Sequence, residues 1–597
     1  MKTLESLSRV LRFVRQVKAL ATPYFSSDER WVARGLLASI VVLNLGAVYL
    51  LVMINDWNRT FYDALQNLNQ PVFWTELWRF GAIAAVYICV AVYRFYLTQR
   101  LEMRWRRWMS EHMLRRWLDT GAFYRIELLR PTRADGEIAD NPDQRIQEDV
   151  AQFTTATVSL AMGLLNALVT LASFVGILWG LSGAFAFQLG GESWSIPGFM
   201  VWMAVLYCLL GSVVTHVIGR RLAPLNFQQQ RLEADFRHHL IRVRDFSESI
   251  ALDRGATIER RQLDARLGDV LANYWNLLRT QKSLLWFTTS FGQAASVFPF
   301  IVAAPRFFSG AIQLGELMQV ASAFGRVQDA LSWFVDNYDR LAAWGATTQR
   351  LTGFEHTLAA QEGAGQPAMP QSQAADEVAL QQLAIQVPVN GASGLRSLID
   401  ADALRLEPGQ RVLLQGPSGC GKSTLFRALA GIWPWVGQKT QVNLPADFRD
   451  ASMFLPQRPY LPLGSLRQAL AYPAEAGRYD DATLRAVLDR VRLGHLGGAL
   501  DESAAWNQRL SGGEQQRLAI ARALLRKPRW LFADEASSAL DAETEEKLYQ
   551  QLLVLVAERS GALVSIAHRP SVAAFHDWRW NVDATGHVTA APTAAAA

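Results

Sequence analysis

Gly416-Pro-Ser-Gly-Cys-Gly-Lys-Ser-Thr424 fits the pattern G-x-x-x-x-G-K-[ST] and directly follows the apolar run Arg411-Val-Leu-Leu-Gln415. The apolar run predicts a buried strand, and the glycines let the following backbone bend so that its N–H groups point at phosphate oxygens. Lys422 is then placed to reach the β- and γ-phosphates, and the Ser423 hydroxyl to bind Mg²⁺. A plain turn between strand and helix is the alternative that this pattern alone leaves open. The loop residues expected to contact nucleotide are Gly416, Pro417, Ser418, Gly419, Cys420, Gly421, Lys422, Ser423 and Thr424.

Two segments further along the chain carry patterns that suit the same chemistry. Trp530-Leu-Phe-Ala-Asp-Glu535 is an apolar strand that ends in two carboxylates. We expect Asp534 to hold Mg²⁺ and Glu535 to polarise the attacking water. Leu510-Ser-Gly-Gly-Glu-Gln-Gln-Arg517 predicts the start of a helix whose N–H groups can face a γ-phosphate. The residues that would present these groups are Ser511, Gly512 and Gly513.

In this order the segments resemble those of the ATP-binding cassette (ABC) transporters, with ATP and Mg²⁺ as the implied cofactors. The resemblance implies that Gln457 is the Q-loop glutamine, which serves both Mg²⁺ and catalysis. It implies that Ser538-Ala-Leu-Asp541 is the D-loop, with Asp541 near nucleotide, and that His568 is the switch histidine that touches the γ-phosphate.

One family feature is not evident, namely the aromatic residue that stacks on adenine ahead of the P-loop strand. The corresponding stretch, Ile385-Gln-Val-Pro-Val-Asn-Gly391, contains no ring. Since stacking of a base on an aromatic ring contributes about 1 to 3 kcal/mol in nucleic-acid systems, two explanations stay open. Either Val387 or Val389 offers an aliphatic face, or the preference for the base is loose.

The composition indicates a membrane protein with a soluble domain. Half of the 597 residues are hydrophobic and only 19% are charged, yet the mean hydropathy is just +0.06, so polar segments must dilute apolar ones. Apolar runs long enough to cross a bilayer lie near 35–54, 79–98, 157–181, 198–219 and 283–304, with a weaker sixth near 313–338.

Basic residues crowd alternate loops between these runs, which explains the isoelectric point near 9.1 without a nucleic-acid partner. The same distribution places both termini in the cytoplasm, and we expect a multi-pass protein of the bacterial inner membrane. The run Arg104-Trp-Arg-Arg-Trp108 could form a patch for nucleic acid or anionic lipid. A helix that leaves the membrane with snorkelling arginines is the favoured interpretation.

The sixth segment carries charges that would be costly against lipid. Arg326 and Asp329 are one helical turn apart, and Asp336 lies on nearly the same face as Asp329. We expect this face to line the substrate path. For Asp336 the alternative is an ordinary solvated charge on a cytosolic stretch of helix.

Segments outside the spans narrow the resemblance. Tyr24-Phe-Ser-Ser-Asp-Glu-Arg-Trp31, Asn141-Pro-Asp-Gln-Arg-Ile146 and Glu233-Ala-Asp-Phe-Arg237 resemble half-transporters of the subfamily that joins peroxisomal fatty-acyl transporters (subfamily D) to bacterial SbmA/BacA-like proteins. That family has short cytosolic helices that press on the nucleotide-binding domains, and the resemblance places them near 128–146 and 246–256. Where relatives commonly carry an aromatic pair, this chain has Leu252-Asp253.

The resemblance implies an exporter-like (type IV) ABC fold, in which a six-helix all-α transmembrane domain precedes an α/β P-loop nucleotide-binding domain. Residues 355–378 are rich in Ala, Gln, Gly and Pro, as linkers are, and the alanine-rich end predicts disorder. The expected domains are an N-terminal cytosolic elbow helix at 1–34, the transmembrane domain at 35–354, the linker at 355–378, the nucleotide-binding domain at 379–589 and a tail at 590–597.

Three classes of function suit the nucleotide motifs: an ATP-driven transporter, an ATP-gated membrane regulator that moves nothing, and a soluble ATPase acting on nucleic acid. The apolar spans argue against the last class. An intact Glu535 and the charged sixth segment favour transport over regulation. The charges on the sixth segment also favour a polar or amphipathic cargo, a peptide or a small molecule such as a cobalamin-like solute, over a lipophilic fatty-acyl cargo. Because the resemblance requires the P-loop of one copy to face the Leu510–Arg517 signature of another, it implies a homodimer in the lipid bilayer that works by alternating access.

Overall fold

The structure is a computed structural model that describes residues 2–129, 141–182, 184–189, 192–363, 376–388 and 394–593. These residues divide into two compact units. The first comprises residues 1–117 and 139–356, and the second comprises residues 118–138 and 357–597. Much of the expected linker, Val389 and the end of the expected tail lie outside the described residues.

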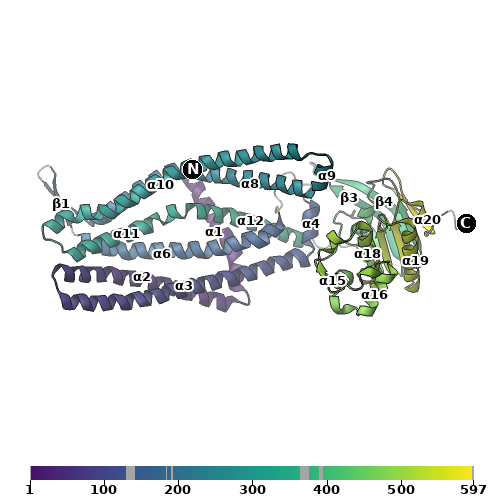
Figure 1. Cartoon of the computed structure of the whole chain (residues 1–597), viewed down its shortest axis with the longest axis horizontal. Coiled ribbons are helices and arrows are strands. Elements are labelled where there is room, and N and C mark those ends of the chain that lie inside the picture. The colour runs from purple at the N-terminus through teal and green to yellow at the C-terminus, as the bar shows by residue number, and fades with distance from the viewer. Residues whose placement is uncertain are drawn as a thin grey trace. The chain divides into compact units, whose positions relative to one another are not determined.

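Long helices make up most of the first unit and run alongside one another (Figure 1). A β-hairpin that the sequence did not predict, formed by β1 (Ala184–Leu189) and β2 (Glu192–Pro197), interrupts them between α6 and α7. The helices are α1 (Lys2–Ser26), α2 (Arg30–Gln66), α3 (Gln70–Asp119), α5 (Pro142–Gln144), the π-helical turn η2 (Arg145–Asp149), α6 (Val150–Ser182), α7 (Phe199–Gly219), α8 (Leu222–Asp245), α9 (Ser247–Leu252), α10 (Ala256–Phe308), α11 (Leu314–Asp336) and α12 (Tyr338–Gly363).

In the described part of the chain, five helical segments are long and apolar enough to cross a membrane by length and composition. The predicted spans between residues 35 and 304 all fall on these segments, which extend well beyond them. The extensions are charged, as in the C-terminal part of α3, so a hydropathy window misses them. The segments are Arg30–Gln66, Gln70–Asp119, Pro142–Ser182, Phe199–Asp245 and Ala256–Phe308.

Helix α11, which corresponds to the weaker sixth run, lies at the centre of the first unit. It packs against α2, α6, α7 and α10, and Phe324 and Val327 are buried in a cluster with side chains of α6 and α7. At its start, Asp63 of α2 accepts a hydrogen bond from the N–H of Gly315 at 2.8 Å. A Cβ at Gly315 would lie 2.0 Å from the carbonyl oxygen of Arg59, so only glycine permits this approach. Neighbouring helices therefore cover part of the surface of a helix whose sequence is too polar for a lipid-facing span.

The N-terminal motif at 24–31 and the Arg-Trp run at 104–108 pack on each other. The Tyr24 ring stacks on Trp105 at a centroid distance of 5.8 Å, and both residues are buried. Glu29 forms ion pairs with Arg104 at 3.1 Å and with Arg107 at 3.2 Å. The guanidinium groups of Arg104 and Arg107 therefore join the connection between α1 and α2 to α3. The interpretation of this run as snorkelling arginines stays a prediction.

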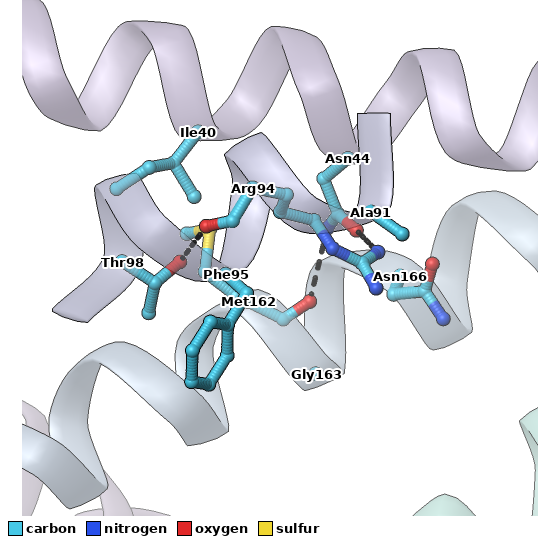
Figure 2. Close-up of a pocket in the computed structure, with 9 residues that line it drawn as sticks. All are labelled: Ile40, Asn44, Ala91, Arg94, Phe95, Thr98, Met162, Gly163 and Asn166. Atoms are coloured by element: carbon cyan, nitrogen blue, oxygen red, sulfur yellow. Dashed lines mark hydrogen bonds between the residues drawn. The ribbon is translucent and has the colours of Figure 1, made fainter. Parts of the chain in front are cut away.

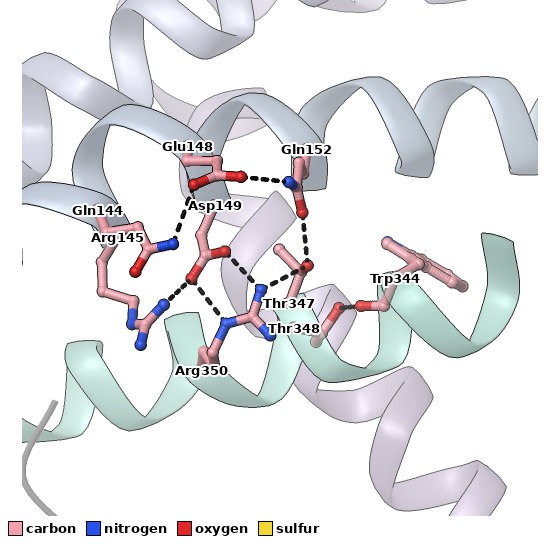
Figure 3. Close-up of polar contacts among 9 residues, drawn as sticks. All are labelled: Gln144, Arg145, Glu148, Asp149, Gln152, Trp344, Thr347, Thr348 and Arg350. Carbon is pink, nitrogen blue, oxygen red and sulfur yellow. Dashed lines mark hydrogen bonds and ion pairs between the residues drawn. The ribbon is translucent and has the colours of Figure 1, made fainter. Parts of the chain in front are cut away.

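The motif at 141–146 contributes to a second polar junction, which Figure 3 shows between the start of α6 and helix α12. Asp149 is 1% exposed and accepts hydrogen bonds from Arg145 at 2.7 Å and from Arg350 at 2.9 and 2.6 Å. Thr347 extends the network by donating to Gln152. In other proteins, removal of one partner from a buried ion pair lowers the stability of the fold by several kcal/mol, because the remaining charge stays buried without compensation. We expect the same for a buried carboxylate with two guanidinium partners. The junction therefore fixes the position of η2 relative to α12.

In the second unit a six-stranded sheet has the strand order β13-β12-β5-β11-β10-β7 and is parallel except for β13 at its edge. A second sheet has the order β4-β3-β6, and β8 pairs with β9. The strands are β3 (Val378–Pro388), β4 (Leu395–Leu406), β5 (Arg411–Gln415), β6 (Gln441–Asn443), β7 (Ser452–Leu455), β8 (Gly464–Ser465), β9 (Ser503–Ala504), β10 (Trp530–Asp534), β11 (Ala562–Ile566), β12 (Trp578–Val582) and β13 (Val588–Pro592).

Helices of the second unit cover these sheets, and two apolar clusters form its core. The first gathers mainly side chains of helices that pack on the parallel sheet, and the second fills the space around the antiparallel one. The helices are α13 (Lys422–Leu429), α14 (Phe448–Ala451), α15 (Leu466–Ala471), η3 (Ala476–Arg478), α16 (Asp481–Arg490), η4 (Gly494–Leu496), α17 (Trp506–Arg509), α18 (Gly512–Arg526), α19 (Ala542–Glu558) and α20 (Pro570–Ala573).

One short helix from the N-terminal half, α4 (Ala122–Leu129), belongs to the second unit. Leu128 packs against the core cluster that includes residues of α13. Burial raises the pKa of Tyr124, and the nearby Arg427 of α13 opposes the rise. The cytosolic helix predicted near 128–146 therefore begins earlier in the chain, and much of the predicted segment lies outside the described residues.

Candidate functional site

Four of the predicted motif segments follow the carboxyl ends of neighbouring parallel strands. The P-loop (residues 416–424) follows β5 and His568 follows β11. Asp534 ends β10 and Glu535 comes directly after it, and Gln457 follows β7. These strands lie in the order β5-β11-β10-β7. Since carboxyl ends of parallel strands meet at one edge, where α/β sheets bind ligands, strand order alone gathers the four segments.

The P-loop has the backbone that its glycines were expected to permit. Gly419 and Gly421 have φ values of 79° and 102°, in the left-handed region that disfavours other residues. A Cβ at Gly421 would also lie 2.7 Å from the Leu398 side chain. Helix α13 begins directly after this turn, at Lys422, so its positive end points into the loop.

The side chain of Lys422 folds back into the P-loop. Its ammonium group donates hydrogen bonds to the carbonyl oxygens of Gly416 and Pro417, each at 2.9 Å, and the residue is 7% exposed. The loop thus concentrates one buried cation and the N–H groups of a helix start, which together favour an anion.

Asp534 and Ser423 bring two oxygen ligands together beside the loop. Burial raises the pKa of Asp534, and a hydrogen bond with the Ser423 side chain opposes the rise. In the described residues no three His, Cys, Asp or Glu side chains gather as a metal site. One carboxylate with a hydroxyl still fits Mg²⁺, because this ion commonly takes one or two protein carboxylates together with phosphate oxygens.

The Glu535 carboxylate contacts both other residues predicted for catalysis. Gln457 donates from Nε2 to one carboxylate oxygen at 2.7 Å, and His568 Nε2 lies 3.2 Å from the other. The backbone of Glu535 has a φ of 47°, a strained value for a residue with a Cβ. Three segments from three strand ends therefore converge on one carboxylate.

The signature and the D-loop each begin a helix. Ser511 caps α18 through a capping box with Glu514, in which Glu514 accepts the N–H of Ser511 at 2.9 Å. Asp541 caps α19 by accepting the N–H of Thr544 at 2.8 Å. Hydrogen bonds from Thr544 lower the pKa of Asp541 below its usual value. The described contacts of Ser511 join it to its own helix and not to its own P-loop.

Gln516 lies inside the signature octapeptide, and no role was predicted for it from the sequence. It is 4% exposed and its amide nitrogen donates to the Ser538 hydroxyl at 3.0 Å and approaches the carbonyl oxygens of Gln457 and Glu535 at 3.3 and 3.4 Å. Its amide oxygen accepts the N–H of Ala539 at 2.9 Å. One buried amide thereby connects the signature helix, the Q-loop, the catalytic strand and the D-loop. The role of Gln516 becomes visible only in the folded structure, where its side chain lies between polar loops that are distant in the sequence.

We expect Gln516→Ala to lower kcat for ATP hydrolysis by about 10- to 100-fold, because small misplacements of catalytic groups have effects of this size. The KM for ATP should change little, since the P-loop is untouched. Steady-state kinetics of the full chain in lipid nanodiscs would measure both constants. Gln508→Ala, at an exposed position of α17, is the matched control, and a kcat equal to that of the parent would refute the positioning role of Gln516.

Of the two residues predicted to offer an aliphatic face to adenine, the structure describes Val387. Val387 is partly buried and packs against the second core cluster, and Val389 lies outside the described residues. Cys420 also packs partly against this cluster, so its side chain contributes to the seating of the loop.

The structure does not pair the charged residues of α11. Asp329 and Asp336 are exposed and Arg326 is partly buried, and in the described part of the chain none of the three forms an ion pair within 4.0 Å. The charged face predicted from the spacing therefore lies on the side of α11 that does not pack against the neighbouring helices.

Two family descriptions match the chain. Residues 20–308 match "ABC transporter transmembrane region 2", and residues 399–538 match "ABC transporter". A solved structure, described as a bacterial Atm1-family ABC exporter with ATP bound, superposes with a TM-score of 0.67. It covers 94% of this chain and 95% of its own at 18% identity, so this likeness concerns the fold.

Curated relatives span nearly the same length. The inner membrane ABC transporter ATP-binding protein YddA of Escherichia coli is 34% identical over 93% of this chain and 94% of its own. The chloroplastic ABC transporter D family member 2 of Arabidopsis thaliana is 32% identical over 94% of this chain and 84% of its own. The mouse lysosomal cobalamin transporter ABCD4 is 28% identical over 80% of both chains.

Proposed function

The chain belongs to the ABC transporters, as a half-transporter of the subfamily D type with an ATPase coupled to transport, and from this premise we propose that two copies form a homodimer that moves a polar or amphipathic solute across the bacterial inner membrane. Alternating access, driven by closure and reopening of the paired nucleotide-binding domains, is the proposed mechanism. The convergence of Gln457 and His568 on Glu535 is the observation that carries the proposal.

Each half of the chain has a defined part in this cycle. Lys422 and the N–H groups of the P-loop would bind the phosphates of ATP. Ser423 and Asp534 would hold Mg²⁺, which would supply positive charge beside the phosphoryl group that is transferred. Glu535 orients and polarises the attacking water, and Gln457 and His568 position its carboxylate. After hydrolysis the paired nucleotide-binding domains separate, and the transmembrane helices return to their starting arrangement.

The homodimer is supported by surfaces that one copy leaves unmatched. Ser511 and the following glycines expose a helix start with no contact to the P-loop of the same chain. Helix α9 buries none of its residues: its last residue, Leu252, is 78% exposed, and Phe246 directly before the helix is 57% exposed. A second copy would supply a P-loop for the first surface and a nucleotide-binding domain for the second.

A polar or amphipathic cargo, peptide or cobalamin-like, is supported by the open charges of Arg326, Asp329 and Asp336 on α11. A relative described as a lysosomal cobalamin transporter agrees with it. A lipophilic fatty-acyl cargo is the second candidate, and an ATP-gated regulator without transport is the third. The crowding of basic residues in alternate loops supports cytoplasmic termini.

Proteoliposomes that contain the purified full chain would test the proposal. We expect ATP-dependent movement of labelled cobalamin or of a labelled peptide, with a matched rise in ATPase rate, and neither with Glu535→Gln. Movement of a labelled acyl compound alone would favour the second candidate. ATP turnover that responds to none of these labels and moves none of them would contradict transport of these cargoes.

A further inference from the structure

The first unit contains a polar site between three membrane helices that the nucleotide chemistry does not use. Arg94 lies on α3 in the middle of an apolar segment, Asn44 on α2 and Asn166 on α6. Together with apolar neighbours these residues line a cavity of about 290 Å³. Figure 2 shows the Arg94 guanidinium between the side chains of Asn44 and Asn166.

The guanidinium group is held in place by neutral groups. Arg94 Nη1 donates to Asn44 Oδ1 at 3.0 Å, and Asn44 Nδ2 donates to the carbonyl oxygen of Met162 at 3.1 Å. The second bond fixes the orientation of the Asn44 amide, so that its oxygen faces the arginine. Asn44 is 3% exposed, which indicates a built arrangement in place of a side chain that snorkels to the interface.

Among the described residues, the positive charge of Arg94 has no counter-charge within ion-pair distance. The residues that line the cavity include no acid, and within the described ranges no carboxylate lies within the 4.0 Å that defines an ion pair with Arg94. Only Nη1 of its guanidinium forms a hydrogen bond there. An ionised side chain in a membrane segment is costly unless a partner compensates it, and such residues commonly mark substrate pathways.

We propose that this cavity binds the carboxylate of an amphipathic cargo, with Arg94 as the ionic partner and Asn166 as a further hydrogen-bond donor. The forked guanidinium group suits a planar carboxylate. The single positive charge of Arg94 balances the single negative charge of a carboxylate. A doubly charged phosphate monoester would keep one uncompensated negative charge in the cavity. The inference rests on the proposed transport function and narrows its cargo to solutes that carry a carboxylate, which favours a peptide over cobalamin.

The remaining walls suit the apolar part of such a molecule. Ile40, Ala91, Phe95 and Met162 line the cavity beside the polar cluster. The volume is near the lower end for ligand pockets, so it accommodates a carboxylate with the adjoining few carbon atoms and leaves a larger body outside. Gly163, also in the lining, lies close to α11, because a Cβ there would be 2.8 Å from Trp333 Nε1. The cavity therefore adjoins the helix whose open face carries Arg326 and Asp329.

Thermal stabilisation by decanoate tests the site without ATP, so the outcome does not depend on transport. The full chain would be placed in phosphatidylcholine nanodiscs and titrated with decanoate, with decanol as the uncharged probe. We expect saturable stabilisation by decanoate only. Arg94→Gln should weaken it by about 10- to 100-fold, the range for a lost charge-assisted hydrogen bond. Arg100→Gln, at an exposed position on the same helix, should leave it unchanged.

Asn166→Asp provides a second test that keeps Arg94 and supplies it with an internal anion. This variant should melt at a higher temperature than the parent and bind decanoate at least 10-fold more weakly. Decanoate affinity equal to the parent's in Asn166→Asp or in a folded Arg94→Gln would overturn the proposal, as would equal binding of decanol. Stabilisation that depends on Arg94 with phosphatidylglycerol nanodiscs but not with decanoate would assign the site to a lipid headgroup and also overturn it.

Discussion

Replacement of Glu535 by Gln should lower ATP turnover by about 100-fold or more, the effect of removing a positioned general base. The amide keeps the shape of the side chain, but it cannot take a proton from water. Gln457 and His568 hold one carboxylate oxygen each, so the amide also cannot satisfy both partners as an acceptor. Lys422 and Asp534 are unchanged, and ATP affinity should therefore persist.

The measurement pairs steady-state ATPase activity with binding of labelled ATP, both on the full chain in nanodiscs. Glu546→Gln, which neutralises an exposed carboxylate on α19, controls for the change of charge and should behave as the parent. Turnover within about 3-fold of the parent in Glu535→Gln would show that another group activates water, since a general base contributes more than this.

The second large effect concerns mixed dimers of Lys422→Ala and Ser511→Arg. If each ATP lies between the P-loop of one copy and the signature of the other, the arrangement of the two lesions decides the result. Both lesions in one copy, beside an unaltered partner, damage both sites and should reduce ATPase activity to background. One lesion in each copy concentrates the damage in one site and leaves the other whole.

Purification through two different affinity tags, one on each copy, would isolate the mixed dimers. Nucleotide trapping should then be clearly higher when the lesions lie in opposite copies than when they share one. Each single variant, paired with the unaltered chain, serves as the reference for one damaged site. Equal trapping by the two arrangements would argue against a shared site and hence against the proposed homodimer.

The nucleotide motifs could be located from sequence because their chemistry depends on local patterns. A P-loop needs glycines at positions of positive φ directly before a helix, and Gly419 and Gly421 have this conformation. Ser511 and Asp541 are small polar residues at helix starts, and both form caps. Gln516 was missed because its contacts join segments that are distant in the chain, and no local pattern distinguishes it from its neighbour Gln515.

The membrane helices show the corresponding limit for the fold. Apolar runs located five of them, but their charged extensions, such as the end of α3, depend on partners including Glu29 for Arg104. The hydropathy of helix α11 is too low to place it among the candidate membrane helices. Its central position is apparent only from its packing against four neighbouring helices. The Arg94 cavity likewise joins residues of α2, α3 and α6, so their separate positions in the sequence gave no indication of it.

The membership of α4 in the nucleotide-binding unit has a consequence for biosynthesis. Ribosomes make a chain from its N-terminus, and domains generally fold as units as they emerge. Leu128 is therefore synthesised before every strand of the sheet on whose core it packs. A recombinant fragment that begins after residue 356 would lack this helix and expose apolar surface to the solvent. Completion of the nucleotide-binding unit thus waits for the strands of its sheets, all of which are synthesised after the long helices of the first unit.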